Sequence, residues 1–236
     1  MATPPRGTAD RVDRMSEAVD ALGTVGDVRG DRRVPSKGER QRRAILDSIA
    51  RLLAVRPIGE LTVGEIAADA GVGRSGFYVY FETKYTALAV LTSEIWEALM
   101  QRVDAFARRA DESAEEYLLR IGSGTLQIWR DNDAVLIASI QAAPLDEQLA
   151  AMWQSWNGRL ADILTAQILR DRDKGRAHPI SADVPTLAST LLECTQHMFY
   201  LDRLHKCDDA ETSRMFATIR AMWVSCAWGA TPTSAP

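Results

Sequence analysis

The segment LTVGEIAADAGVGRSGFYVYF, residues 61–81, constrains the fold more than any other part of the chain. Thr62 and the glutamate three residues after it form a T-x-x-E capping box, which marks the start of a helix. Gly71 follows that short helix, at a point where a positive φ angle costs little only for glycine. Phe77 and Phe81 are four residues apart, so they lie on one face of a second helix and can anchor it to a core. The segment predicts two short helices joined by a tight turn.

The remaining sequence is also typical of helices. Apolar residues such as Ile45, Ile49, Leu52 and Leu53 recur at helical spacing, and Gly, Pro, Asp and Asn clusters separate one periodic stretch from the next. Nothing alternates like a strand for more than a few residues, and no internal repeat has a fixed period. We therefore predict an all-α fold of about nine helices. The later ones are expected near residues 83–103, 113–130, 133–142, 145–173, 183–205 and 209–228.

We expect three regions along the chain. Residues 1–36 show little apolar periodicity and are predicted to be a mostly disordered extension with a short helix near Met15–Leu22. Residues 37–86 form an N-terminal three-helix domain that contains the segment described above. Residues 87–236 form a larger helical domain.

Composition excludes several classes of protein. Apolar residues make up 46% of the chain and charged residues 25%, as in an ordinary globular protein. The sequence has no apolar run long enough for a membrane helix and no secretory signal at its N-terminus. Three cysteines give no disulfide framework, so we expect a cytoplasmic protein.

Two helices joined by a tight turn form a helix-turn-helix, whose second helix enters the DNA major groove. Its outward face would carry arginine, serine and tyrosine side chains, which bond bases and phosphates. Residues 29–43 add seven basic residues against two acidic ones, a local charge suited to a polyanion. Helix N-termini add partial positive charge for phosphates. The predicted DNA-binding residues are Arg40, Arg42, Arg43, Thr62, Arg74, Ser75, Gly76, Tyr78, Tyr80 and Lys84.

Residues 40–88 closely resemble the N-terminal domain of the tetracycline-repressor (TetR) family of bacterial regulators. The resemblance rests on LTVGEIAADAGVGRSGFYVYFETKYTAL, with its T-V-x-x-I-A pair, its A-G-V turn, its F-Y-x-Y-F block and its F-x-x-K-x-x-L ending. Two positions depart from the family pattern, which usually has Ser where Gly73 stands and often Thr where Gly76 stands. The resemblance therefore implies a DNA reader but does not transfer an operator sequence.

The resemblance also implies that the C-terminal domain binds a small ligand and forms a homodimer on a palindromic operator. Its many aromatic side chains suit a small hydrophobic effector that releases a repressor from DNA. The stretches AAMWQSWNGRLADIL, MFYLDRL and MWVSCAWG resemble the subgroup of mycobacterial repressors of ethionamide activation. The predicted ligand-binding residues are Trp96, Phe106, Trp129, Trp153, Trp156, Leu191, Cys194, Phe199 and Trp223.

Alternative interpretations of the same residues exist. The helical hairpin could serve packing alone, and each aromatic residue could belong to the core. The regulator could also act without a ligand, as an activator or an architectural DNA binder. Cys194, His197, His205 and Cys207 are possible zinc ligands, but a tetrahedral site would need a sharp turn between the two pairs. We find no catalytic motif, and we expect no enzyme activity, no metal and no cofactor.

Overall fold

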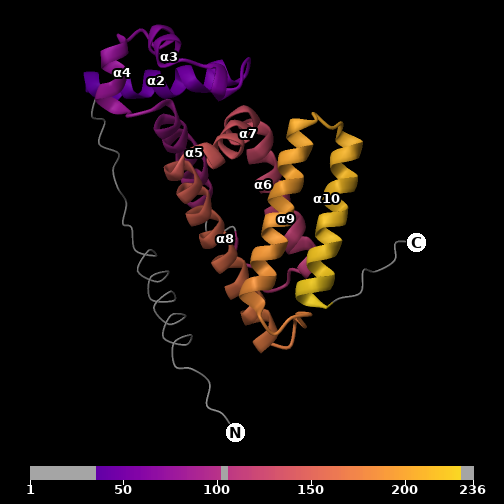
Figure 1. The fold of residues 1–236 in the computed structure, drawn as a ribbon. Coiled ribbons are helices and arrows are strands. Elements are labelled where there is room, and N and C mark those ends of the chain that lie inside the picture. Colours follow the sequence, from indigo (N-terminus) through magenta and orange to yellow (C-terminus); the bar gives the residue numbers. More distant parts are fainter. Residues whose placement is uncertain (1–35, 102–105, 230–236) are drawn as a thin grey trace, which may run out of the picture. The chain divides into compact units, whose positions relative to one another are not determined.

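The structure, a computed structural model, describes residues 36–101 and 106–229, and within these ranges it contains helices and no strands (Figure 1). The chain divides into two compact units, Met1–Gly38 and Glu39–Pro236, and the elements below belong to the second apart from the start of the first helix. The predicted all-α fold is confirmed, with nine α-helices in the described ranges. No described helix is long and apolar enough to cross a membrane.

The N-terminal helices are α2 (Lys37–Leu53), α3 (Val63–Asp69) and α4 (Arg74–Tyr80), with a short 3-10 turn, η1 (Ile58–Glu60), between the first two. The predicted capping box is present: the Thr62 hydroxyl accepts from the Glu65 amide, and the Glu65 carboxylate accepts from the Thr62 amide. Gly71 adopts φ +67°, the left-handed conformation predicted for the turn. Local sequence signals therefore set this part of the fold.

A shared core holds these helices together. Phe77 and Phe81 are buried as predicted, with ring centroids 5.8 Å apart. Ile45 and Ile49 of α2 are fully buried in the same core. The buried Ser48 hydroxyl donates to the Ile66 carbonyl at 3.0 Å, which ties α2 to α3. The core thus fixes the position of α4 while leaving its other face free.

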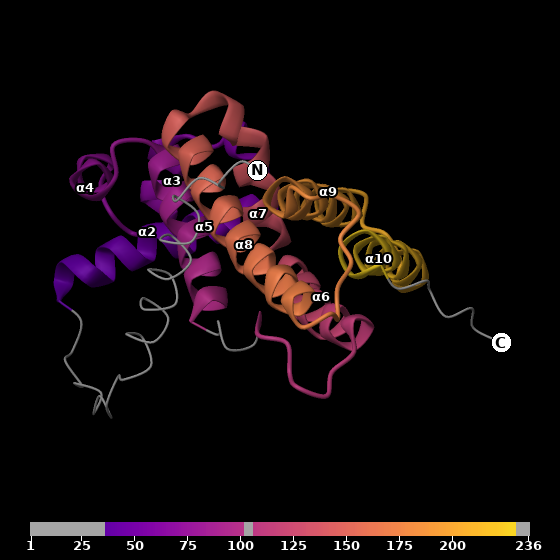
Figure 2. The ribbon, with the colours of Figure 1, turned by 90° about the horizontal axis from the view of Figure 1, so that it is seen from below.

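The C-terminal helices follow the expected order with small shifts at their ends. They are α5 (Lys84–Met100), α6 (Ala114–Asp131), α7 (Asp133–Ala142), α8 (Glu147–Asp173), α9 (Val184–Leu204) and α10 (Asp209–Trp223), with a 3-10 turn, η3 (Ala143–Leu145), and a π-helical turn, η4 (Val224–Trp228). The two views in Figures 1 and 2 show α9 and α10 side by side, and α9 also packs on α8. The short helix predicted near Met15–Leu22 lies outside the described residues.

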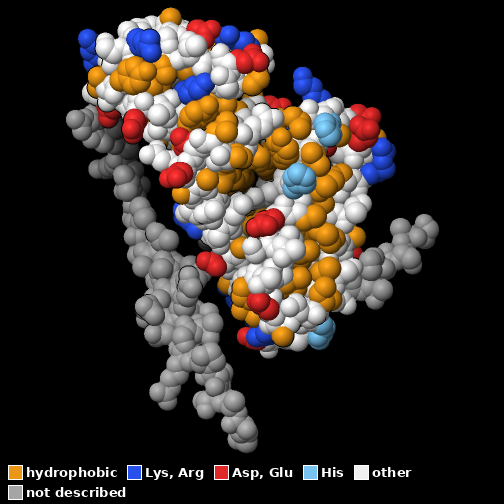
Figure 3. Space-filling model, in the orientation of Figure 1, with side chains coloured by type: hydrophobic (Ala, Val, Ile, Leu, Met, Phe, Trp, Pro, Cys, Tyr) orange, Lys and Arg blue, Asp and Glu red, His pale blue; other side chains and the backbone are white. Residues whose placement is uncertain are grey.

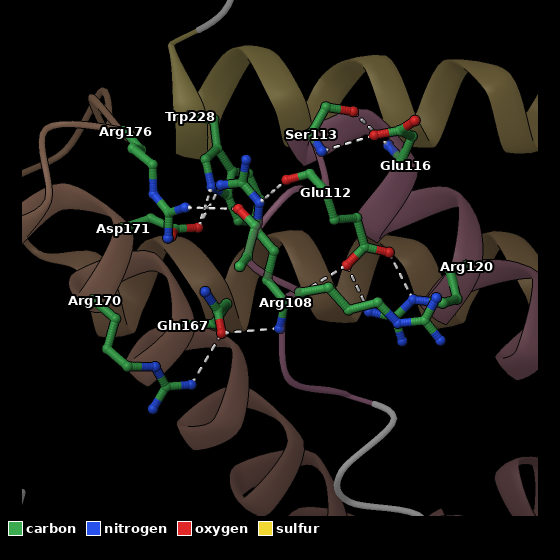
Figure 4. A network of polar contacts seen from close by, with 12 residues as sticks. Arg108, Glu112, Ser113, Glu116, Arg120, Gln167, Arg170, Asp171, Arg176 and Trp228 are labelled. Carbon is green, nitrogen blue, oxygen red and sulfur yellow. Dashed lines mark hydrogen bonds and ion pairs between the residues drawn. The ribbon is translucent and has the colours of Figure 1, made fainter.

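A buried carboxylate joins the far end of α8 to the C-terminal turn (Figure 4). The Asp171 carboxylate has no exposed surface and accepts from Arg108 at 2.7 Å, Arg176 at 2.7 Å and the Trp228 indole at 3.0 Å. Burial alone would raise the pKa of Asp171, but hydrogen bonds from Trp228 and Arg108 outweigh burial and lower it. This network connects three segments that are distant in the sequence.

A second, partly buried ion pair makes the stability of the fold depend on pH. The Arg120 guanidinium donates to both carboxylate oxygens of Glu112, at 2.7 and 2.8 Å, and this contact lowers the pKa of Glu112 to about 2 against the opposing effect of burial. A lowered pKa stabilises the fold above about pH 4.3, the pKa of an unfolded glutamate, and the effect is lost as the pH falls toward 2.

We expect Glu112→Gln to lower the free energy of unfolding by about 2 kcal/mol at pH 7, and the difference from the unchanged protein to shrink between pH 5 and pH 2. Urea unfolding at several pH values measures both effects. Glu115→Gln, a substitution at an exposed position three residues away, is the matched control and should change stability little at any pH. A difference that stays constant down to pH 2 would show that the lost ion pair is not its source.

Candidate nucleic-acid interface and regulatory cavity

Helix α4 has one buried and one exposed face. Phe77 is fully buried, whereas Arg74 and Ser75 are exposed, and Tyr78 is 48% exposed. Val79 is 74% exposed and lies beside them. Hydrogen-bonding groups and an apolar side chain therefore share one surface, which suits the mixture of polar edges and thymine methyl groups in the major groove.

Val79 is the residue on this face that our prediction missed. It stands four residues after Ser75, so helical spacing alone places both on one side of α4. Val79 has no hydrogen-bonding group that would indicate a contact with DNA, and apolar residues in a sequence are usually assigned to the core. Its exposure becomes clear only once Phe77 fixes which side of the helix is buried.

The two glycines of α4 differ in role from the glycine of the turn. Gly73 is the N-cap residue and provides no capping side chain. Gly76 has only ordinary neighbours, since a Cβ there would lie 3.7 Å from the Val72 Cβ. Neither has a positive φ, so the fold itself would accept a side chain at Gly76. Hence the protein's own packing does not require the bare surface at Gly76.

Three arginines of α2 are predicted DNA contacts, and two of them are engaged with α5. Arg43 donates to Glu94 at 2.7 Å and to Asp47 at 2.7 Å, and these hydrogen bonds raise its pKa. Arg42 lies 3.7 Å from the same Glu94 carboxylate and over the Phe81 ring. Arg40, the third, is largely exposed. The contacts with Glu94 connect α2 to α5, at the start of the C-terminal region.

The other predicted DNA contacts also bond within the protein. The Tyr80 hydroxyl donates to Gln41 at 3.0 Å and is half-buried. The Lys84 ammonium donates to the carbonyls of Gly59 and Leu61 at 3.1 and 2.8 Å, and burial lowers its pKa. The Thr62 side chain caps α3. These side chains brace the region around α3 and α4, and their contact with DNA stays a prediction.

An apolar cavity lies among the C-terminal helices. Its volume is ≈ 70 Å³, and its walls come from Leu99 of α5, Leu118 of α6, Leu164 of α8, Phe199 of α9 and Trp223 of α10 among others. One water needs about 10–15 Å³ by this measure, whereas pockets for drug-sized ligands have about 300 Å³ or more. Occupation by a ligand of that size must therefore move the lining helices apart.

Three of the nine predicted ligand-binding residues line this cavity: Phe106, Phe199 and Trp223. The structure does not bring the other six to it. Five of them are buried in the core: Trp96, Trp129, Trp153, Trp156 and Leu191. The sixth, Cys194, is exposed. The Trp96 and Trp153 rings contact each other edge to face at 5.6 Å, which is the packing of a core pair.

Sequence reasoning missed the polar residues of the cavity wall. Gln196 and Arg220 line it, and Gly122 leaves room for a ring, since a Cβ there would lie 2.6 Å from Phe216. Gln196 lies on α9, a helix in which polar and apolar residues are mixed. Its spacing from neighbouring residues such as Tyr200, four positions later, does not indicate that its side chain faces the cavity. Within the described ranges no three or more His, Cys, Asp or Glu side chains come together in a group that could hold a metal ion, so the four possible zinc ligands are not gathered at one place.

Comparisons with known proteins agree with this geometry. Residues 45–88 match the family described as "Bacterial regulatory proteins, tetR family", and residues 121–229 match "Transcriptional regulator EthR, C-terminal domain". The chain is 24% identical over 202 residues to the HTH-type transcriptional regulator EthR of Mycobacterium tuberculosis, covering 85% of this chain and 93% of that protein. It is 40% identical over 85 residues to the HTH-type transcriptional repressor LfrR of Mycolicibacterium smegmatis, covering 32% and 44%.

Solved structures share the fold at low sequence identity. A TetR-family regulator structure from Syntrophomonas wolfei superposes with a TM-score of 0.66 at 17% identity, covering 84% of this chain and all of that one. The reduced form of NemR from E. coli superposes with a TM-score of 0.60 at 15% identity, covering 82% of this chain and all of that one. Both similarities concern the arrangement of helices in the two regions described above.

Proposed function

Because this chain belongs to the TetR family of transcriptional regulators, we propose that it is a repressor that reads DNA through α4 and is released by a small apolar ligand. The observation that carries the proposal is the exposed face formed by Arg74, Ser75, Tyr78 and Val79 on a helix anchored by the buried Phe77. The bound DNA is double-stranded, and residues 37–86 form the reading domain. Such a regulator works in the cytoplasm, where the bacterial chromosome lies.

The proposed regulator acts as a homodimer. One helix-turn-helix covers only half of an operator, so two copies related by a two-fold axis read a palindrome. Helices α9 and α10 are consecutive and antiparallel, and apolar side chains gather over them on the face shown in Figure 3. A face of this kind supports a four-helix contact between two copies. Residues 87–236 then serve both dimerisation and ligand binding.

Helix α5 offers a physical link between the cavity and the DNA. Its Leu99 lines the cavity, whereas its Glu94 holds Arg43, and Lys84 at its start holds the turn before α3. A helix of 17 residues is about 25 Å long and moves as a stiff rod. A ligand that widens the cavity therefore displaces α5 and changes the separation of the two reading helices. DNA and ligand then favour different separations, so each weakens binding of the other.

The test begins by selecting a DNA fragment from a random pool with the purified protein. Affinity should fall steeply with salt, by about 10³-fold between 50 and 200 mM if six phosphates are contacted. Hydrophobic compounds should raise the melting temperature and release the fragment at the same concentrations, since both effects report one binding event. DNA binding with no releasing compound in a broad screen would favour a ligand-independent regulator. Failure to select any DNA would overturn the proposal.

A further inference from the structure

The wall of the apolar cavity contains one charged side chain, Arg220 of α10, and one buried amide, Gln196 of α9. The rest of the described wall is apolar apart from glycine and two threonines. Arg220 and Gln196 are therefore the groups that can recognise a polar part of a ligand.

Neither side chain has a hydrogen-bonding partner in the described part of the chain. The Arg220 guanidinium lies over the Phe216 ring, 6.0 Å from its centroid. The threonine hydroxyls of the wall are used: Thr195 accepts from the Trp223 indole at 2.8 Å and donates to a backbone carbonyl, and Thr125 donates to another. Arg220 and Gln196 thus keep their donors for a bound molecule.

The charge and shape of these groups select the ligand. A guanidinium has five donors in a planar fork that matches a carboxylate with two parallel hydrogen bonds, and the bond is stronger in apolar surroundings. An amine would be repelled by Arg220, because no carboxylate lines the cavity to compensate it. A carboxylate is also compact, which suits a cavity of ≈ 70 Å³.

We propose that the cavity binds an apolar carboxylic acid, with its carboxylate on Arg220 and the amide of Gln196 and its hydrocarbon part among Phe199, Leu160 and Leu164. The inference rests on the proposed function and adds the chemical class of the effector to it. The acid group sets the orientation of the molecule at α9 and α10, and the hydrocarbon part separates these helices from α6 and α8.

Three probes of equal chain length test the proposal: octanoate, methyl octanoate and 1-octanol. Calorimetry at pH 7.5 should show octanoate binding about 10–100-fold more tightly than the ester or the alcohol, the range expected for hydrogen bonds to a charged group. Arg220→Met keeps an unbranched apolar stem but removes the guanidinium, so it should remove this preference, while the affinity for the two neutral probes changes less than about 3-fold. Arg220→Lys should keep part of the preference, because it keeps the charge.

Arg214→Met is the matched control, since Arg214 is an exposed arginine on the same helix that does not line the cavity. It should leave the preference unchanged. Equal binding of all three probes, or an unchanged preference in Arg220→Met, would overturn the acid site and leave an apolar ligand site standing. If none of the probes binds, the acid proposal fails, whereas DNA release by other apolar compounds still tests the proposed function by itself.

Discussion

Arg74→Ala is expected to weaken binding to the selected DNA fragment on the order of 100-fold without changing the melting temperature. Arg74 is exposed at the first position of α4 and makes no hydrogen bond or ion pair in the described part of the chain, so its removal costs the fold little. A bidentate arginine contact to guanine contributes about 1–3 kcal/mol, and a dimer loses two such contacts. Fluorescence anisotropy with the selected fragment measures the change in affinity.

The matched control for Arg74 is Lys174→Ala. Lys174 is an exposed cation just beyond α8, so its removal changes the net charge equally but not the reading helix. It should alter DNA affinity less than about 3-fold at 150 mM salt, because a distant exposed charge is largely screened. If both substitutions weaken binding equally, Arg74 does not provide the sequence-specific contact. A second substitution, Tyr78→Ala, then decides whether another residue of the same face replaces Arg74.

Of the substitutions proposed for this protein, Asp171→Ala is expected to destabilise the fold most. It should lower the free energy of unfolding by about 3–5 kcal/mol. The substitution leaves Arg108 buried without its carboxylate and removes the acceptor of the Trp228 indole. A domain of this size loses about 2–4 °C per kcal/mol, so the melting temperature should fall by roughly 6–20 °C. Urea unfolding and thermal melts measure the two quantities.

Asp173→Ala provides the comparison on the same helix. The Asp173 side chain is 70% exposed and lies 3.3 Å from Arg172, so its loss should cost less than about 0.5 kcal/mol. A stability change for Asp171→Ala as small as that for Asp173→Ala would contradict the view that the buried network joins α8 to the C-terminal turn. Because this network is not part of the proposed DNA-reading face, any folded Asp171 variant should still bind the selected fragment.

Local signals account for what could be predicted. The capping box at Thr62, the turn at Gly71 and the i, i+4 pair of Phe77 and Phe81 each depend on residues close in the chain. For this reason the helix-turn-helix and the outward position of Arg74 followed from the sequence. The ends of the helices did not follow to the residue, because the final turns depend on caps and on neighbouring helices.

Long-range contacts account for what could not be predicted. The contact between Arg43 and Glu94 joins residues 51 positions apart, and no local pattern pairs them. The aromatic residues of the C-terminal region illustrate the same limit: Trp223 lines the cavity whereas Trp153 packs against Trp96. Both are large side chains on helices, and only the packing of neighbouring helices decides which of them borders empty space.

The sequence by itself determined the helices and the helix-turn-helix whose second helix is the proposed reading helix, because capping, turn and helical periodicity act over a few residues and leave direct traces in the order of amino acids. The tertiary structure decided which basic residues are braced by carboxylates, where the cavity lies, and that Arg220 and Gln196 face it. Those properties depend on which helices pack side by side, and packing brings together residues that the sequence keeps far apart.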